Sequence, residues 1–497
     1  MWNEPQAIAW LAANRGFFDP TLRIPKDQLF AKKAVVELAL LVAYRHRLEP
    51  APLTPDWLAL LDTVEQVASR PAYVEAAARD PRALLLYALT FAALRICGRE
   101  NPEFAHVVEQ CLATGYATAA ERLPYRRMDL LHFLLISGFD PSAGSKLDET
   151  YLSTLLAQSP NVVELNDSDV YAITHALFYL TDFGQRPATT SADVPAILEA
   201  LLRLAIAERN ADLAGELLCC ALPYGLANTA AGWNLLATMQ QPDGRLPGPP
   251  GVVQPAPTDP PGYFAWKQAY HTTIVGVLAS LMAKAPLCPV TLTPAVDCPL
   301  RTPCVTDWVA RHLADADPRA LGAETLVSLG CPIPGLDPDM LPSDPRTYAS
   351  AKQLSAHGHL SLAYYPPITF NEPPSAADLI ALTAGEPDRI LWASPALREE
   401  TIIRLAGELR QAIRAYHLHE VSTALRALLA IVGPADRLVS DGAAWLATQQ
   451  RRDGSYGYLI IENLEVRLVF TQSANLLFGQ LSQAFASIPR TPSSVCV

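Results

Sequence analysis

The sequence lacks the features that mark several common functional classes. No run of lysine and arginine interleaved with aromatic residues occurs, and the 497 residues carry a net charge of −12. Because a nucleic-acid-binding surface needs a basic face, we expect no nucleic-acid partner. The longest apolar stretches, 83–94 and 272–283, are shorter than the roughly 20 residues that a membrane span requires. We therefore expect no membrane span either.

Paired cysteines and targeting signals are also missing. The nine cysteines are scattered and include no C-x-x-C pair. No basic region followed by an apolar run opens the sequence. Both absences favour reduced thiols and a cytoplasmic protein. Only 18% of the residues are charged and 50% are hydrophobic, which provides material for a large core and argues against disorder.

Helical periodicity dominates, and the alternating pattern of β-strands is nearly absent. Short connections with Gly, Pro, Asn or Asp separate the periodic segments, as hairpins of helices require. The fold class is therefore predicted to be all-α. Helices are expected over 5–14, 31–45, 55–68, 82–97, 102–114, 126–137, 147–157, 168–182, 194–208, 212–222, 230–240, 269–283, 398–416, 417–431, 440–450 and 466–486.

Prolines are concentrated in residues 287–395, where helical periodicity fades. Proline removes a helical hydrogen bond and clashes with the preceding turn. We interpret this segment as an irregular, Pro-rich insertion with a few short helices. Residues 1–286 and 396–497 are expected to form one discontinuous domain around it.

One segment of the sequence is repeated. WLATQQRRDGSYG at 445–457 matches LLATMQQPDGRLP at 235–247 in register at Ala, Thr, Gln, Asp and Gly. In both copies an apolar helix ends, and Asp-Gly supplies a left-handed turn into the next helix. Repeats of this size indicate helix pairs that bury their faces against neighbouring pairs.

The copy at 445–457 resembles the QW motif of squalene and hopene cyclases and the related turns of protein prenyltransferase β-subunits. The motif positions are occupied by Gly442, Trp445, Leu446, Gln449, Gly454 and Tyr456. The resemblance implies an α/α toroid of repeated helix pairs, whose inner helices line an apolar cavity. It also implies an isoprenoid-type enzyme, for which bacterial natural-product biosynthesis is the expected setting.

A second resemblance lies at Tyr270-His271-Thr272, which is similar to the Tyr-His-Thr helix start of protein prenyltransferase β-subunits. In that family the histidine binds zinc together with an aspartate and a cysteine, two residues apart on the preceding inner helix. The aspartate maps onto Asp212, but Ala214 occupies the cysteine position. We therefore expect no cofactor. If zinc is bound, Asp212 and His271 are its ligands, with Glu216 as a substitute for the thiolate.

The candidate catalytic residues are ionisable or hydroxyl groups on three predicted helices: Tyr171, His175, Tyr179, Asp182, Asp212, Glu216 and His271. Helical spacing places the first four on one stripe and puts Asp212 and Glu216 on one face. His271 is expected at a helix start, where the helix dipole favours the neutral imidazole. Each residue also has a structural interpretation, as a buried hydrogen-bonded group or a helix cap.

The leading hypothesis is a terpene-cyclase-like enzyme that acts on an apolar or mixed substrate in a central cavity. It would use acid–base chemistry for a cyclisation or isomerisation. Two alternatives stay open: a non-catalytic α/α scaffold that binds a lipid, a peptide or a carrier-bound intermediate, and a zinc enzyme related to prenyltransferases. Convergence of His175, His271 and Glu216 around one pocket is the feature that separates an enzyme from a scaffold.

Overall fold

The computed structural model confirms the all-α prediction. Nearly all of its regular elements are helices, and its strands form two pairs of short parallel strands. None of the described helices combines the length and the apolar character needed to cross a membrane. The structure describes residues 2–22, 25–80, 83–227, 229–249, 259–294, 308–316, 368–383, 390–457 and 463–487.

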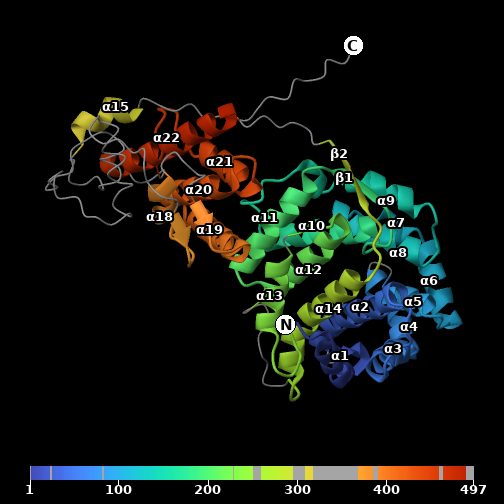
Figure 1. Ribbon diagram of the computed structural model, residues 1–497. Helices are drawn as coiled ribbons and strands as arrows, with labels where there is room; N and C mark the ends of the chain where they lie inside the picture. Colours follow the sequence, from blue (N-terminus) through green and yellow to red (C-terminus); the bar gives the residue numbers. More distant parts are fainter. Residues whose placement is uncertain are drawn as a thin grey trace, which may run out of the picture. The chain divides into compact units, whose positions relative to one another are not determined.

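The chain divides into two compact units. The first comprises residues 1–160 and 165–296, and the second comprises residues 161–164 and 297–497. Figure 1 colours the helices of the first unit from blue to yellow-green and α18 to α22 of the second from orange to red. The division at residue 296 lies close to the boundary at 286 expected from the prolines. That residues 396–497 complete a barrel with residues 1–286 stays a prediction.

Six helices of the first unit pack against one another in a continuous series. They are α2 (Pro25–Leu48), α5 (Leu85–Ile96), α8 (Pro124–Ile136), α10 (Asp167–Thr181), α12 (Ala211–Ala221) and α14 (Tyr263–Lys284). Each packs against the next one named, and α14 packs against α2 (Figure 1). The series therefore ends where it begins.

The other helices of the first unit lie between these six in the sequence or precede them. They are α1 (Glu4–Ala13), α3 (Pro55–Ala68), α4 (Pro71–Arg79), α6 (Pro102–Ala113), α7 (Tyr116–Ala119), α9 (Ala143–Tyr151), α11 (Val194–Ala207) and α13 (Ala230–Met239). Helix α3 packs against α2 and α5, α9 against α8 and α10, and α11 and α13 against α12. Strands β1 (Ala188–Ser191) and β2 (Val290–Thr293) pair in parallel.

In five of the six neighbouring pairs of the series, all except α5 and α8, contacts show that the helices run in the same direction. Asp212 of α12 contacts Thr272 of α14, and three residues later Gly215 lies directly against Val275. Residue numbers thus rise together along both helices. Four other pairs of helices each show two contacts in the same order. They are Lys32–Tyr87 and Val42–Cys97 for α2 and α5, Tyr125–His175 and His132–Asp182 for α8 and α10, Tyr171–Asp212 and Thr174–Glu216 for α10 and α12, and Phe30–Trp266 and Glu37–His271 for α2 and α14.

The second unit contains α15 (Trp308–His312), α18 (Ala376–Thr383), α19 (Pro395–Ala415), α20 (Leu418–Val432), α21 (Arg437–Thr448) and α22 (Leu464–Ser487). Helix α20 packs against α18, α19, α21 and α22. Strands β3 (Ile368–Phe370) and β4 (Ile390–Trp392) pair in parallel. Of the expected insertion at 287–395, residues 295–307, 317–367 and 384–389 lie outside the described residues.

The sequence repeat forms the same turn in both units. The amide of Gln240 donates to the carbonyl of Gly244 at 3.1 Å, and that of Gln450 donates to Gly454 at 3.2 Å. Both glycines have positive φ, 99° and 91°, as predicted for a left-handed turn. Two residues beyond each glycine, a backbone N–H donates to a threonine on the next helix, Leu246 to Thr273 and Tyr456 to Thr471. Helices α13 and α14 are therefore repeated as α21 and α22.

Candidate functional site

Carboxylates from two helices surround one histidine in the first unit. Nδ1 of His271 lies 3.2 Å from Oε2 of Glu37, while its Nε2 lies 3.4 Å from Oε1 of Glu216 and 3.7 Å from Oδ2 of Asp212. The other oxygen of Glu216, Oε2, lies 3.6 Å from Nδ1 of His175. We call these five residues the His271 cluster. They come from α2, α10, α12 and α14.

Helix caps place two of these side chains. Asn210 caps α12 by accepting a hydrogen bond from the backbone N–H of Leu213. Asp212 therefore falls in the first turn of α12, and Glu216 follows one turn later on the same face. Both carboxylates are buried, with 5% and 1% of their side chains exposed.

Hydroxyl groups of the neighbouring helices hold the two carboxylates of α12. Tyr171 donates to Oδ2 of Asp212 at 2.5 Å, and Thr272 donates to Oδ1 at 2.7 Å. Thr174 donates to Oε2 of Glu216 at 2.5 Å. Each carboxylate thus has a fixed orientation set by side chains from another helix.

The electrostatics of the cluster favour a protonated His271. Burial alone lowers the pKa of His271, but Glu37, Asp212 and Glu216 together raise it well above the usual range. Burial alone raises the pKa of Glu37, but His271 and Lys33 lower it to about 2. Similarly, His175 and His271 lower the pKa of Glu216 against the effect of burial. At neutral pH the cluster therefore contains an imidazolium beside the ionised carboxylates of Glu37 and Glu216.

The expected position of His271 at a helix start is wrong. Helix α14 begins at Tyr263, two turns earlier, because Gly262 adopts a left-handed conformation and Trp266 continues the helix while packing edge-on against Phe18. The helix dipole acts mainly within the first turn. It therefore does not set the protonation of His271, and the neighbouring carboxylates do.

His175 lies in an aromatic environment. Its ring centroid is 5.7 Å from that of Phe178 and between 6.1 and 6.3 Å from those of Tyr125, Tyr171 and Tyr179. The side chain is 25% exposed. Nδ1 lies 3.3 Å from the hydroxyl of Thr174, and Nε2 has no hydrogen-bond partner among the described residues. One ring nitrogen is therefore oriented by the protein, and the other is available.

Asp182 belongs to a separate cluster. Helix α10 ends at Thr181, and Asp182 adopts a left-handed conformation with φ 48°, so it leaves the stripe on which the sequence placed it. Its carboxylate accepts two hydrogen bonds from Arg47, at 3.1 and 2.5 Å, and one from Tyr44, at 2.5 Å. Nε2 of His132 lies 2.9 Å away. Burial opposes ionisation, but His132 and Arg47 hold the pKa of Asp182 below its usual value.

Tyr179 lies between the two clusters. Its ring is 5.2 Å from that of His132 and 6.1 Å from that of His175, and its hydroxyl is hydrogen-bonded to Asp129. Burial and Asp129 raise its pKa, so it remains a phenol. Of the seven residues predicted from the sequence, the structure brings Tyr171, His175, Asp212, Glu216 and His271 together. Tyr179 is at their edge, and Asp182 is outside.

Glu37 is the site residue that the sequence analysis missed. It is the one charged residue in the apolar segment 34–44, AVVELALLVAY. An isolated carboxylate within an apolar helix must be paired when it is buried. That pattern was the signal in the sequence, although it does not indicate His271 as the partner.

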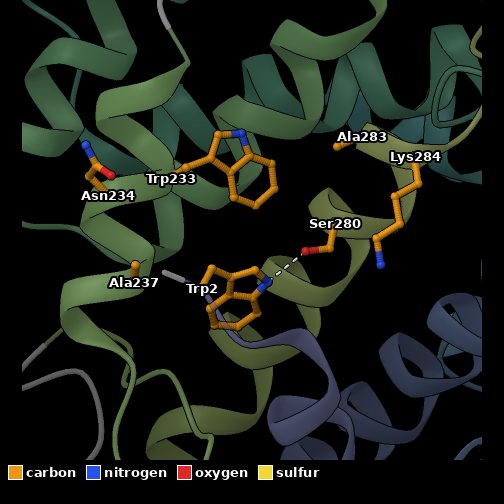
Figure 2. Close-up of a pocket in the computed structure, with 7 residues that line it drawn as sticks. All are labelled: Trp2, Trp233, Asn234, Ala237, Ser280, Ala283 and Lys284. Atoms are coloured by element: carbon orange, nitrogen blue, oxygen red, sulfur yellow. Dashed lines mark hydrogen bonds between the residues drawn. The ribbon is translucent and has the colours of Figure 1, made fainter.

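A pocket of about 260 Å³ lies elsewhere in the first unit (Figure 2). Its lining is Trp2, Trp233, Asn234, Ala237, Ser280, Ala283 and Lys284, and Trp2 donates a hydrogen bond to Ser280 at 2.7 Å. The helical period of about 100° per residue places Ser280 and His271 on opposite faces of α14. The pocket is therefore separate from the His271 cluster.

The zinc site implied by the prenyltransferase resemblance does not fit these residues. Ala214 is fully buried at the cysteine position. The nearby Cys219 and Cys220 are buried, and burial raises the pKa of both thiols. A thiolate ligand is thus missing. However, Asp212, Glu216 and His271 offer ligand atoms that all lie within 4.8 Å of one another.

Comparison with known proteins identifies a family for this chain but does not indicate an activity. A family described as a domain of unknown function (DUF6895) matches residues 5–281. This segment contains every residue of the His271 cluster. No curated protein and no solved structure matches the chain.

Proposed function

The chain belongs to the family described as a domain of unknown function (DUF6895), and we propose that its family segment is an enzyme with an α/α toroid fold. Two observations support the toroid: six helices pack in a series that returns to its start, and the helices of five of the six neighbouring pairs run in the same direction. The inner helices of a toroid have this arrangement. The His271 cluster lies on four of the six helices.

The proposed chemistry is proton transfer by His175. The observation that carries the proposal is that His175 and His271 both face Glu216, at 3.6 and 3.4 Å. A carboxylate beside Nδ1 favours the tautomer with its proton on that nitrogen, which leaves Nε2 as a base. His271, as an imidazolium, holds Glu216 in place from the other side. Catalytic hydrogen bonds are often long before the substrate binds.

The surroundings of His175 support an apolar or mixed substrate. Phe178 and three tyrosine rings surround the imidazole, so a hydrocarbon part of a substrate would lie against aromatic surfaces. We propose a cyclisation or isomerisation, because proton transfer alone is sufficient for either reaction. We also propose natural-product biosynthesis as the setting, with a free or carrier-bound substrate, because the motif at 442–456 resembles that of terpene cyclases.

The first test uses the fact that cyclisation and isomerisation conserve mass. Small molecules that copurify with the full chain are separated by liquid chromatography and weighed by mass spectrometry. The wild type should carry or produce two species of equal mass and different retention. His175→Ala should carry only the precursor, with turnover reduced about 10²-fold or more. His106→Ala, at an exposed histidine of α6, should behave as the wild type.

Two outcomes would contradict the enzyme proposal. If His175→Ala converts the precursor as fast as the wild type, His175 is not the base. If wild type and variant both hold one unchanged molecule, the chain is a binding scaffold.

A further inference from the structure

We propose that the pocket beside α14 binds a small planar aromatic molecule with a hydrogen-bond-accepting oxygen, as in a carboxylate or an amide. Its aromatic walls are Trp2 and Trp233, and its polar side is formed by Ser280 and Lys284 (Figure 2). The pocket lies on the face of α14 opposite to His271. The inference therefore goes beyond the proposed acid–base reaction and does not depend on it.

The two indole rings offer aromatic surfaces to a ligand. Trp233 projects from α13 and Trp2 from the segment before α1, and both residues are partly exposed. Aromatic rings pack in offset-stacked or edge-to-face arrangements, and such pairs contribute more than their buried area alone. The volume of about 260 Å³ is slightly below that of most sites for drug-sized ligands. It therefore suits a ligand of roughly one or two fused rings.

Trp2 is held in its position from several sides. Its indole N–H donates to the hydroxyl of Ser280 at 2.7 Å. Its ring lies against Gly276, where a Cβ atom would come within 3.0 Å of the indole. The next residue, Asn3, exchanges two hydrogen bonds with the side chain of Gln240, at 2.8 and 2.9 Å. Because this wall is fixed before a ligand arrives, binding costs little ordering of the protein.

Ser280 and Lys284 offer hydrogen-bond donors to an oxygen atom in the pocket. They lie one turn apart on the same face of α14. Ser280 is buried and accepts a hydrogen bond from Trp2, while its own proton has no acceptor among the described residues. Lys284 pairs with Glu4, but 60% of its side chain is exposed and its ammonium group has three donors. An oxygen of the ligand can therefore accept from both side chains.

The second copy of the repeat shows which residues create the hollow. Counted from the threonine that accepts a hydrogen bond from each turn, Ser280 corresponds to Phe478 and Ala283 to Leu481. Phe478 and Leu481 are buried, so large apolar side chains occupy these positions of α22. On α14 both side chains are small, and the indole of Trp233 leaves about 260 Å³ open beside them. Small residues on α14 thus make room for a ligand.

The test measures the binding of three defined probes. The full chain is dialysed to equilibrium against 2-naphthoate, 2-naphthamide or naphthalene, and the bound amount is measured by liquid chromatography. We expect one molecule of 2-naphthoate or 2-naphthamide per chain, with a dissociation constant between roughly 10 μM and 1 mM for so small a ligand. Naphthalene lacks the oxygen and should bind about 10-fold more weakly.

Three variants locate the site. Ala283→Leu places the side chain of the second copy in the pocket and should weaken binding of both naphthalene derivatives at least about 10-fold by filling the space. Trp233→Ala removes one wall and should weaken both by about 10-fold or more. Lys284→Met should weaken 2-naphthoate more than 2-naphthamide, because a hydrogen bond from an ammonium group to a carboxylate is assisted by charge.

Matched controls separate this pocket from the rest of the protein. Ala113→Leu, at an exposed alanine that ends α6, and Lys146→Met, at another exposed lysine paired with a carboxylate, should bind the probes as the wild type. His175→Ala should do so too, so the acid–base proposal and this one fail independently.

Three results would overturn the proposal: no saturable one-to-one binding of 2-naphthoate and 2-naphthamide, unchanged affinity in Ala283→Leu, or equal affinity for naphthalene. The last would mean that Ser280 and Lys284 take no part. Ala283 and Lys284 are exposed, so their variants keep the test valid if Trp233→Ala does not fold, which circular dichroism reports.

Discussion

At the scale of single residues, Asp182 lies outside the His271 cluster and is held by Tyr44, Arg47 and His132. We expect Asp182→Asn to lower the free energy of unfolding by about 3 kcal/mol, because Arg47 then lacks its buried counter-charge. This is the low end of the usual range, since 27% of the Arg47 side chain is exposed. Urea denaturation at pH 7 measures the effect. Asp148→Asn breaks the ion pair with Arg186, in which 51% of the Asp148 side chain is exposed. It should lower the free energy of unfolding by less than about 1 kcal/mol.

The sign of the pH dependence follows from the lowered pKa of Asp182. A carboxylate whose pKa is lower in the folded state stabilises the fold above its unfolded pKa of about 3.9. That contribution is lost as the pH falls toward the folded value. The difference in stability between wild type and Asp182→Asn should therefore shrink below about pH 4. A constant difference down to pH 2 would mean that the charge of Asp182 is not what stabilises the protein.

The sequence predicted much of the site at this scale, for a physical reason. Tyr171 and His175 lie one turn apart, as do Asp212 and Glu216, and helical periodicity alone places each pair on one face. Glu37 was not predicted, because its partner His271 is far away in the sequence. Only the packing of α14 against α2 brings them together. Asp182 was misplaced because helix ends are poorly marked in a single sequence.

At the scale of elements, the contact between α12 and α14 depends on a glycine. A Cβ atom at Gly215 would lie 2.7 Å from Cγ1 of Val275, within the buried face of both helices. We expect Gly215→Ala to destabilise the fold by about 1–3 kcal/mol through overpacking. Val275→Ala alone should also destabilise it by leaving a cavity. In the double variant the new methyl group occupies that space, so the two losses should not add.

A double-mutant cycle measured by thermal or urea unfolding checks this contact. We expect a coupling energy of at least about 0.5 kcal/mol in the stabilising direction. Strict additivity would mean that α12 and α14 are further apart than the geometry indicates.

A comparison of the predicted and observed helix boundaries shows which stabilising interactions can be recognised from the sequence. The predicted 212–222 and 168–182 differ from α12 and α10 by one residue at each end, because Asn caps mark both helix starts. The predicted start of α14 at residue 269 is six residues late. Its first turns carry Tyr263 and Trp266, whose rings contact those of Phe17 and Phe18 from another part of the chain. Tertiary packing of aromatic rings stabilises these turns, and no local pattern announces it.

At the scale of the whole molecule, the packing series and the repeat lead to different expectations. The repeat around Trp445 led us to predict that residues 396–497 complete the barrel begun by residues 1–286. The packing series instead returns to α2 from α14 within residues 1–296, and the family segment ends at residue 281. A truncated chain that ends after Val296 would distinguish a barrel completed by residues 396–497 from one closed within residues 1–296.

We expect this truncated chain to fold by itself, because the six packed helices and the whole His271 cluster lie within it. Circular dichroism should show a helical protein with one cooperative thermal transition. If residues 396–497 supply helices to the barrel, the truncated chain would instead leave a row of apolar inner faces exposed. It would then aggregate or melt without cooperativity while the full chain does not, and adding residues 396–497 as a separate polypeptide should restore the transition.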